Sequence, residues 1–302
     1  MVMDFARIVD HAMQDPAVAG LRPVIEKEIL HYDILFALER GGLLRDIIFQ
    51  GGTSLRLCHG GSRFSEDLDF VGGYDFSSRQ LDQMRDCIMD HIGTRYGLEI
   101  AVKPPKEMKF DPNYQGVNTD RWQIAIVTSP ERPDLPKQRI KLEVANVPAY
   151  TSELMSPLRN YDAIPHGYTD VLIPTETIDE IMADKIISLA ACHERVRNRD
   201  IWDLAWLRQH KGEIIPDLIE QKIRDYRIEN YEDKLAARIA NLPAAIQGVE
   251  FRAEMARFIA PEAQKTSLAR PGFLPFLTRQ VTGIMKDAEK ALYHREELAF
   301  MM

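Results

Sequence analysis

The sequence predicts an α+β fold in which a mixed α/β part precedes an all-helical carboxy-terminal part. Short β-prone segments alternate with helical segments up to about residue 168, whereas nearly every segment beyond it has helical periodicity. Glycine and proline residues punctuate both parts. We therefore expect two domains, residues 1–168 and residues 169–302.

Each expected element follows from the spacing of its apolar residues and from the turn-forming residues at its ends. Helices are predicted at residues 23–40, 77–96, 177–195, 199–211 and 216–227. Strands are predicted at residues 46–50, 66–71, 98–102, 122–128 and 139–147.

The composition limits the classes of partner. The chain has 302 residues, of which 45% are hydrophobic and 28% charged, and this balance suits a folded core. Lys and Arg number 38 and Asp and Glu number 46, so the net charge is 38 − 46 = −8. This charge argues against nonspecific binding of nucleic acid or membrane, although a local basic strip could still hold a polyanion.

The compartment expected from the sequence is the cytoplasm. The cysteines Cys58, Cys87 and Cys192 are far apart and form neither a disulfide framework nor a metal-binding pair. The amino terminus is charged, so no signal peptide is expected, and no uncharged apolar run reaches bilayer length, so no membrane partner is expected. The histidines lack ligand spacing, and no zinc site is assigned.

The segment Gly51-Gly52-Thr53-Ser54 lies between a predicted strand and a helical stretch. Glycine permits close approach of the backbone to a ligand, and free amides at a helix start can hold phosphate oxygens. The alternative is that the two glycines only form a turn.

Three carboxylates are candidate metal ligands. Asp67 and Asp69 alternate along a predicted strand, so both point to one side, and a hard divalent cation such as Mg²⁺ or Mn²⁺ would neutralise their repulsion. Glu143 joins them if its own strand lies beside theirs. The alternatives are a solvated acidic strand edge for the aspartates and plain exposure for Glu143.

Lys185 lies along the apolar side of its predicted helix, where a lysine needs an anion. It could extend its amino group to solvent, pair with Glu180 or Asp184, or hold the phosphates of a nucleotide.

The segment 195–204 contains the most basic short run of the chain. Asn198 is a candidate helix cap, and Asp200 then falls in the first turn, where the helix dipole favours an acid. Asp203 lies on the same helical face without such a structural reason. Arg199 and its neighbours suit phosphates or an RNA backbone, and they also suit a solvated surface.

Taken in order, these motifs resemble the AbiEii/AbiGii toxin family of nucleotidyltransferases, from about residue 24 to residue 207. The matching segments are Gly51-Gly52-Thr53, Arg63-Phe64-Ser65-Glu66-Asp67-Leu68-Asp69-Phe70, Ile140-Lys141-Leu142-Glu143-Val144, Glu180 with Lys185, and Arg199-Asp200-Ile201-Trp202-Asp203-Leu204. The resemblance implies a polymerase-β-like nucleotidyltransferase core, a mixed sheet flanked by helices, followed by an all-helical domain. It also implies a toxin of a bacterial toxin–antitoxin or abortive-infection system, with an antitoxin or regulator as its protein partner.

The resemblance also implies roles for individual residues. The turn at residues 51–54 would grip the triphosphate, and Lys185 would bind an NTP phosphate. Asp67 and Asp69 would ligate the metal, and Glu143 fills a slot that most often holds aspartate. Asp203 would act as an acid or base near the incoming hydroxyl, supported at the nucleotide by Asp200 and Arg199.

The activity implied is Mg²⁺-dependent transfer of a nucleotide from NTP to RNA, at the acceptor end of tRNA in relatives with an assigned activity. Two alternatives remain, a nucleotide-binding protein that acts by sequestration and a metal-dependent nuclease. The segment Gly51-Gly52-Thr53-Ser54, which we call the glycine turn, precedes Asp67 and favours the transferase. A nuclease has no evident use for a triphosphate site.

Overall fold

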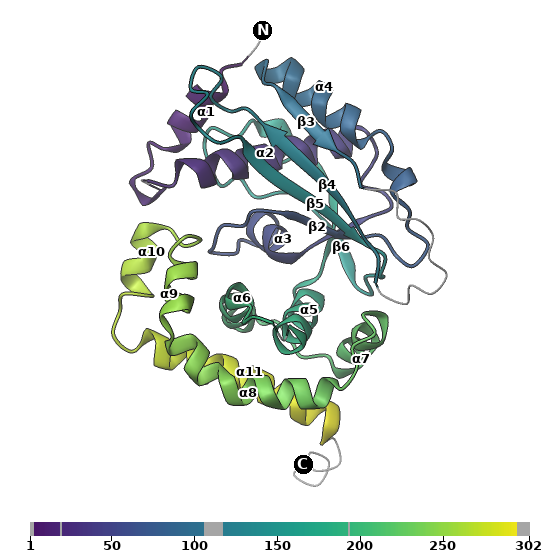
Figure 1. The fold of residues 1–302 in the computed structure, drawn as a ribbon, viewed down its shortest axis with the longest axis vertical. Helices are drawn as coiled ribbons and strands as arrows, with labels where there is room; N and C mark the ends of the chain where they lie inside the picture. The colour runs from purple at the N-terminus through teal and green to yellow at the C-terminus, as the bar shows by residue number, and fades with distance from the viewer. Residues whose placement is uncertain (1–2, 19, 106–116, 193, 295–302) are drawn as a thin grey trace. The chain divides into compact units, whose positions relative to one another are not determined.

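The computed structural model describes residues 3–18, 20–105, 117–192 and 194–294, and Figure 1 shows their elements. The chain divides into two compact units, Met1–Glu176 and Thr177–Met302. The boundary expected near residue 168 precedes this division, because the strand Ile173–Glu176 still belongs to the sheet of the first unit.

The described residues of the first unit form four α-helices and a seven-stranded sheet. Its helices are α1 (Phe5–Ala12), α2 (Arg22–Arg40), α3 (Gly51–Leu57) and α4 (Met84–Tyr96), with 3₁₀ turns η1 (Pro16–Val18), η2 (Ser78–Leu81) and η3 (His166–Tyr168). Its strands are β1 (Ile48–Gln50), β2 (Leu68–Val71), β3 (Ile100–Lys103), β4 (Thr119–Ile126), β5 (Gln138–Ala145), β6 (Ser152–Met155) and β7 (Ile173–Glu176).

The sheet is mixed, as the family resemblance implied, with the strand order β3-β4-β5-β2-β1-β7-β6. Strand β2 runs parallel to β5, and β1 runs parallel to β7, whereas the other neighbours are antiparallel. Strand β2 therefore lies in the interior of the sheet, where Asp69 stands between Gln50 of β1 and Glu143 of β5.

Helices α2 and α4 cover one face of the sheet, with α2 packed on β5 and α4 on β3 (Figure 1). The alternation of strand side chains explains this packing. On β4, Trp122, Ile124 and Ile126 are buried, whereas the intervening Arg121 and Gln123 are exposed. One face of the strands is thus apolar and covered, and the other is polar.

Two expectations about the first unit are corrected. The helix predicted at residues 77–96 is divided, because Ser77 and Gln80 form a capping box around the short turn η2 and α4 begins only at Met84. Strand β6 escaped prediction because it is an edge strand with mostly exposed side chains, which removes the alternating pattern. Gly97, at a φ of 68°, ends α4 as predicted.

The described part of the second unit is helical throughout, as the sequence predicted. Its helices are α5 (Ile178–Ala191), α6 (Asn198–Gln209), α7 (Pro216–Asp225), α8 (Tyr231–Gln247), α9 (Val249–Met255), α10 (Pro261–Thr266) and α11 (Phe273–Tyr293). Helices α5 and α6 pack on each other, and α8 packs on α11. Asn198 is not the cap of α6, because it is the first helical residue and its amide donates to Glu254 at 2.8 Å.

Candidate functional site

The predicted site residues form two groups, one in each unit. In the first unit, Asp67 lies immediately before β2 and Asp69 lies within it. Leu68 and Phe70 are fully buried, while both carboxylate-bearing residues are half-buried, so the acids share the open side of the strand. The alternation that the sequence predicted for this strand is confirmed.

The glycine turn leaves space for the Asp69 carboxylate. Gly51 has a φ of +79°, and a Cβ atom built on it would lie 2.9 Å from Asp69 Oδ2. A Cβ atom on Gly52 would run into the guanidinium group of Arg63 and would lie 3.0 Å from Ser65 Oγ. A side chain at Gly51 would therefore be strained by backbone conformation and would displace the Asp69 carboxylate, whereas a side chain at Gly52 would require the Arg63 guanidinium group to shift.

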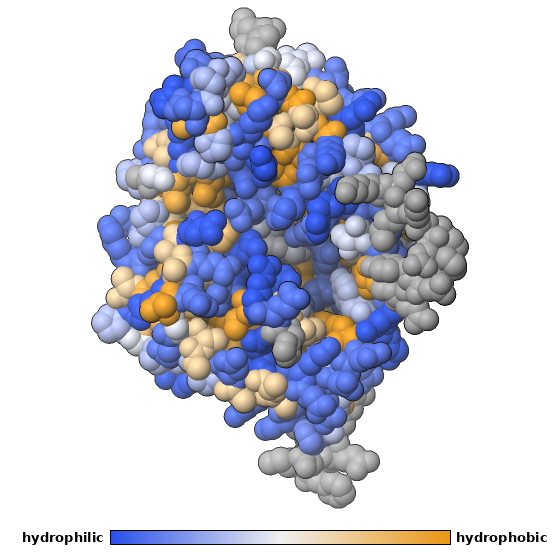
Figure 2. Space-filling model, in the orientation of Figure 1, coloured by the Kyte–Doolittle hydropathy of each residue, from blue (hydrophilic) through white to orange (hydrophobic). Residues whose placement is uncertain are grey.

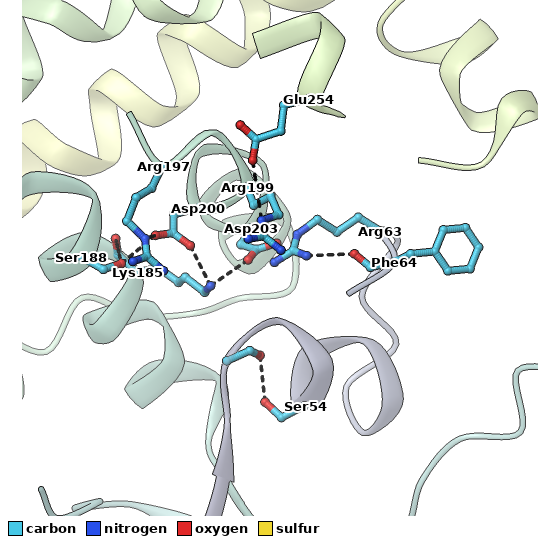
Figure 3. A network of polar contacts seen from close by, with 11 residues as sticks. Ser54, Arg63, Phe64, Lys185, Ser188, Arg197, Arg199, Asp200, Asp203 and Glu254 are labelled. Atoms are coloured by element: carbon cyan, nitrogen blue, oxygen red, sulfur yellow. Dashed lines mark hydrogen bonds and ion pairs between the residues drawn. The ribbon is translucent and has the colours of Figure 1, made fainter. Parts of the chain in front are cut away.

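Thr53 and Ser54 are buried residues of α3 whose hydroxyl groups bond to the backbone. The Thr53 hydroxyl donates to the carbonyl oxygen of Asp67. The Ser54 hydroxyl donates to the carbonyl oxygen of Gly51 at 2.9 Å, as Figure 3 shows. The first of these bonds ties the glycine turn to the residue that precedes β2. The Ser54 bond stays within α3, so the Thr53 hydroxyl is the group that connects α3 to the aspartate segment.

Glu143 lies beside Asp69 in the parallel register of β5 and β2, as the prediction required. Its carboxylate forms an ion pair with Arg121, its neighbour on β4. Asp67 in turn accepts a hydrogen bond from the backbone N–H of Lys141 at 3.3 Å, and the Lys141 ammonium lies 3.6 Å from Asp67 Oδ2. Within residues 3–18, 20–105, 117–192 and 194–294, no group of three or more His, Cys, Asp and Glu side chains is placed to hold a metal ion.

In the second unit, Lys185 of α5 binds two carboxylates of α6 (Figure 3). Its ammonium lies 2.8 Å from Asp200 Oδ1 and 3.0 Å from Asp203 Oδ2, and the Lys185 side chain is only 9% exposed. Of the anions considered for Lys185, Glu180 and Asp184 instead pair with Lys222, at 2.8 Å each. The buried lysine thus joins α5 to α6.

Two residues that the sequence did not single out hold Asp200 in place. The Ser188 hydroxyl donates to Asp200 Oδ2 at 2.7 Å, and Arg197 Nε donates to the same oxygen at 2.5 Å. Burial alone would raise the pKa of Asp200, but the charges of Lys185 and Arg197 outweigh it and hold this pKa well below its usual range. Helical spacing was the available signal, because Ser188 follows Lys185 by three residues and Arg197 precedes Asp200 by three.

Arg199 points to a different partner from the other basic residues of this segment. Its Nε lies 3.7 Å from Glu254 Oε1 (Figure 3). Its guanidinium carbon lies 4.9 Å from the centre of the Phe258 ring. The predicted group in the second unit therefore consists of Lys185, Asp200 and Asp203 in direct contact, with Arg199 turned toward α9.

The Asp200 charge predicts a pH-dependent penalty for Ser188→Ala. A carboxylate whose folded-state pKa is depressed stabilises the fold above its unfolded-state pKa of about 3.9, and this contribution is lost as the pH falls through the folded-state value. Because Asp200 titrates identically in the unfolded wild type and the unfolded variant, Ser188→Ala should cost about 1.5–3 kcal/mol near neutral pH, and less only as the pH approaches the depressed folded-state pKa. Urea unfolding across this range measures the change.

Ser267→Ala is the matched control, because the buried Ser267 hydroxyl donates to the neutral carbonyl of Ala263. Its penalty should not vary with pH. A Ser188→Ala penalty that already fell above the unfolded-state pKa of about 3.9 would contradict the depressed folded-state pKa of Asp200.

The described residues include no helix long and apolar enough to cross a membrane. A mixed sheet with Asp69 on an interior strand and Asp67 immediately before it, followed by a helical unit, is the fold of nucleotidyltransferase toxins.

The chain belongs to the family described as nucleotidyl transferase AbiEii toxin of type IV toxin–antitoxin systems, whose model matches residues 33–279. No curated protein sequence matches the chain. Two solved structures share its fold: MenT4, a nucleotidyltransferase toxin of Mycobacterium tuberculosis H37Rv, and JHP933 of Helicobacter pylori. MenT4 is 18% identical with a TM-score of 0.55, over 98% of this chain and 97% of its own. JHP933 is 18% identical with a TM-score of 0.52, over 92% of this chain and 98% of its own.

Proposed function

We propose that this nucleotidyltransferase transfers a nucleoside monophosphate from an NTP to the 3′ end of an RNA, with tRNA as the acceptor, and that Mg²⁺ or Mn²⁺ assists the reaction. The observation that carries the proposal is the Asp69 carboxylate lodged against the side-chain-free Gly51, with Asp67 on the same side of β2. The transfer would make the modified RNA unusable, and this consequence agrees with membership of a toxin family.

The donor set of the first unit fits a hard divalent cation. Asp67 and Asp69 offer carboxylate oxygens on one side of the strand. Gly51 has no side chain that could cover the Asp69 carboxylate. When bound there, the cation would neutralise charge on the triphosphate and at the attacking hydroxyl. We propose Glu143 as a third ligand, which would have to leave its ion pair with Arg121.

The chemical step needs little covalent work from the protein. The RNA 3′-oxygen forms a bond to the α-phosphorus, the bond from that phosphorus to the bridging oxygen breaks, and pyrophosphate leaves. We assign Asp203 as the acceptor of the hydroxyl proton and Lys185 as a positive charge for a phosphate. Asp200 positions the Lys185 ammonium. Arg199 would supply a further cation for the nucleotide, and for this it would have to leave Glu254.

The glycine turn binds phosphate in this proposal through its backbone. Because Gly51 and Gly52 lack side chains, a phosphate oxygen can approach their main chain closely. Thr53 and Ser54 contribute by holding the turn, since their hydroxyl protons are donated to carbonyl oxygens. A cognate antitoxin, as the name of the family implies, is the expected protein partner.

Incubation of the chain with Mg²⁺, each labelled NTP in turn and total tRNA tests the proposal. Transfer of label into intact RNA is the expected result. Shortened RNA would indicate a nuclease, and nucleotide binding without any transfer would indicate sequestration.

Gly51→Ala should reduce label transfer far more than it reduces stability. A left-handed φ costs an alanine about 1–2 kcal/mol, and the new Cβ must also displace the Asp69 carboxylate. A displacement of this kind is expected to cost about a hundredfold in the rate. Thermal unfolding and the labelling assay measure the two effects.

Gly73→Ala is the matched control, since Gly73 has a φ of +80° and its Cβ would meet nothing within 4 Å. It should lose the same stability and keep its activity. Equal activity of the two variants would remove Gly51 from the proposed site.

A further inference from the structure

The strands β3, β4 and β5 present an open face on the side opposite α2 and α4. Figure 1 shows α2 passing behind these strands, and Figure 2 shows hydrophilic residues over the middle of β4 and β5. Long polar side chains are exposed on this face. We call this surface the cationic face and define it by the exposed residues Lys103, Arg121, Gln123, Arg139 and Lys141.

The pairing of the strands connects the cationic face to the two aspartates of the proposed site, Asp67 and Asp69. Lys103 of β3 stands opposite Gln123 of β4, which stands opposite Lys141 of β5. The Lys141 ammonium in turn lies 3.6 Å from Asp67 Oδ2. One row of side chains therefore runs across three strands and ends at the first aspartate.

A second row of side chains crosses the strands in the same direction, from β4 through β5, and ends at the second aspartate, Asp69. Arg121 of β4 stands opposite Glu143 of β5, and Glu143 stands opposite Asp69 of β2. Arg139 lies on the same side of β5, two positions before Lys141, and stands opposite Ala125. Neighbouring strands are about 4.8 Å apart and alternate residues about 6.8 Å apart, so these cations cover a continuous surface.

The charge of this face contrasts with that of the whole chain. It carries four cations beside one interposed carboxylate, Glu143, whereas the chain has a net charge of −8. Within the part of the chain that the structure describes, Lys103 and Arg139 form no ion pair. The side chains of these two residues are therefore available to pair with an anionic ligand that approaches from solvent.

We propose that the cationic face binds the phosphate backbone of the acceptor RNA and so leads its 3′ end to Asp67 and Asp69. The identity of the occupant rests on the proposed function, and its location rests on charge complementarity and register. The exposed residues of the face include no aromatic ring on which a base could stack. The face therefore contacts phosphates, with strong salt dependence and little preference for sequence.

The test uses the full chain and a short fluorescent single-stranded RNA, with affinity measured by anisotropy over a range of NaCl concentrations. Lys103→Gln combined with Arg139→Gln should weaken binding about tenfold at low salt. The plot of log affinity against log salt should become shallower by about 0.7 for each lost cation. Lys103→Arg combined with Arg139→Lys should bind as the wild type does.

Arg7→Gln combined with Arg85→Gln is the matched control, since these exposed residues on α1 and α4 give the same change of charge elsewhere. It should leave both affinity and slope unchanged. An equal loss in the control, or none in the Lys103 and Arg139 variant, would overturn the inference.

The anisotropy measurement does not depend on nucleotide transfer, so the proposed reaction and the proposed RNA-binding face can be refuted separately. A chain that moves no label but loses RNA affinity in the Lys103 and Arg139 variant alone would refute the transfer reaction and support the cationic face. Binding of a nonhydrolysable NTP should be equal in all these variants, because none of the replaced residues touches the glycine turn. Weaker NTP binding in the Lys103 and Arg139 variant would assign these cations to the nucleotide and overturn the inference.

Discussion

Asp69→Asn is expected to abolish label transfer, with a rate at least about a thousandfold below that of the wild type. Asparagine keeps the shape of the side chain and can still lie against Gly51, but it lacks the charge that a divalent cation requires. The fold should persist, because Asp69 is half-buried and its strand is secured by Leu68 and Phe70 in the core. Labelling with NTP and tRNA measures the rate, and circular dichroism measures the folding.

Asp75→Asn is the matched control, since Asp75 is exposed in the loop after β2 and lies outside the proposed site. It should retain full activity. A second readout tests the metal ligand directly, because Mn²⁺ binding in the presence of a nonhydrolysable NTP should weaken in Asp69→Asn alone. Wild-type transfer by this variant would remove Asp69 from the mechanism.

Lys185→Met is expected to damage both the second unit and the reaction. The substitution leaves Asp200 and Asp203 close together and nearly buried, with the ammonium between them gone. Breaking a buried ion pair by removal of one partner costs about 3–5 kcal/mol, and Arg197 still compensates Asp200 in part. Urea unfolding should show this loss, and transfer per folded molecule should fall by orders of magnitude.

Lys222→Met separates the two effects, because Lys222 is also buried and also bridges two carboxylates, those of Glu180 and Asp184. It should destabilise the unit to a similar extent yet keep its activity per folded molecule. Adding Asp203→Asn to Lys185→Met should recover part of the stability and none of the activity. Equal activity per folded molecule in Lys185→Met and Lys222→Met would make Lys185 a structural residue only.

Periodicity and turn residues predicted the α+β class and most of the helices, and the family resemblance implied the mixed sheet. They succeeded because residues such as Trp122 and Leu142 show the alternation that burial of one sheet face imposes on a strand. They failed at β6, whose edge position removes the alternation, and at residues 77–96, where a local capping box interrupts a helix that apolar spacing alone would continue.

The sequence by itself determined which acids share a side of a strand, because alternation is a local property of the backbone. It left open which anion meets Lys185, since Asp200 and Asp203 come from a different helix than Glu180 and Asp184. The packing of α5 on α6 decided that pairing. The order of strands likewise decided that Asp69 meets Gly51 and that β5 leads to β2, because long-range pairing leaves no trace in local periodicity.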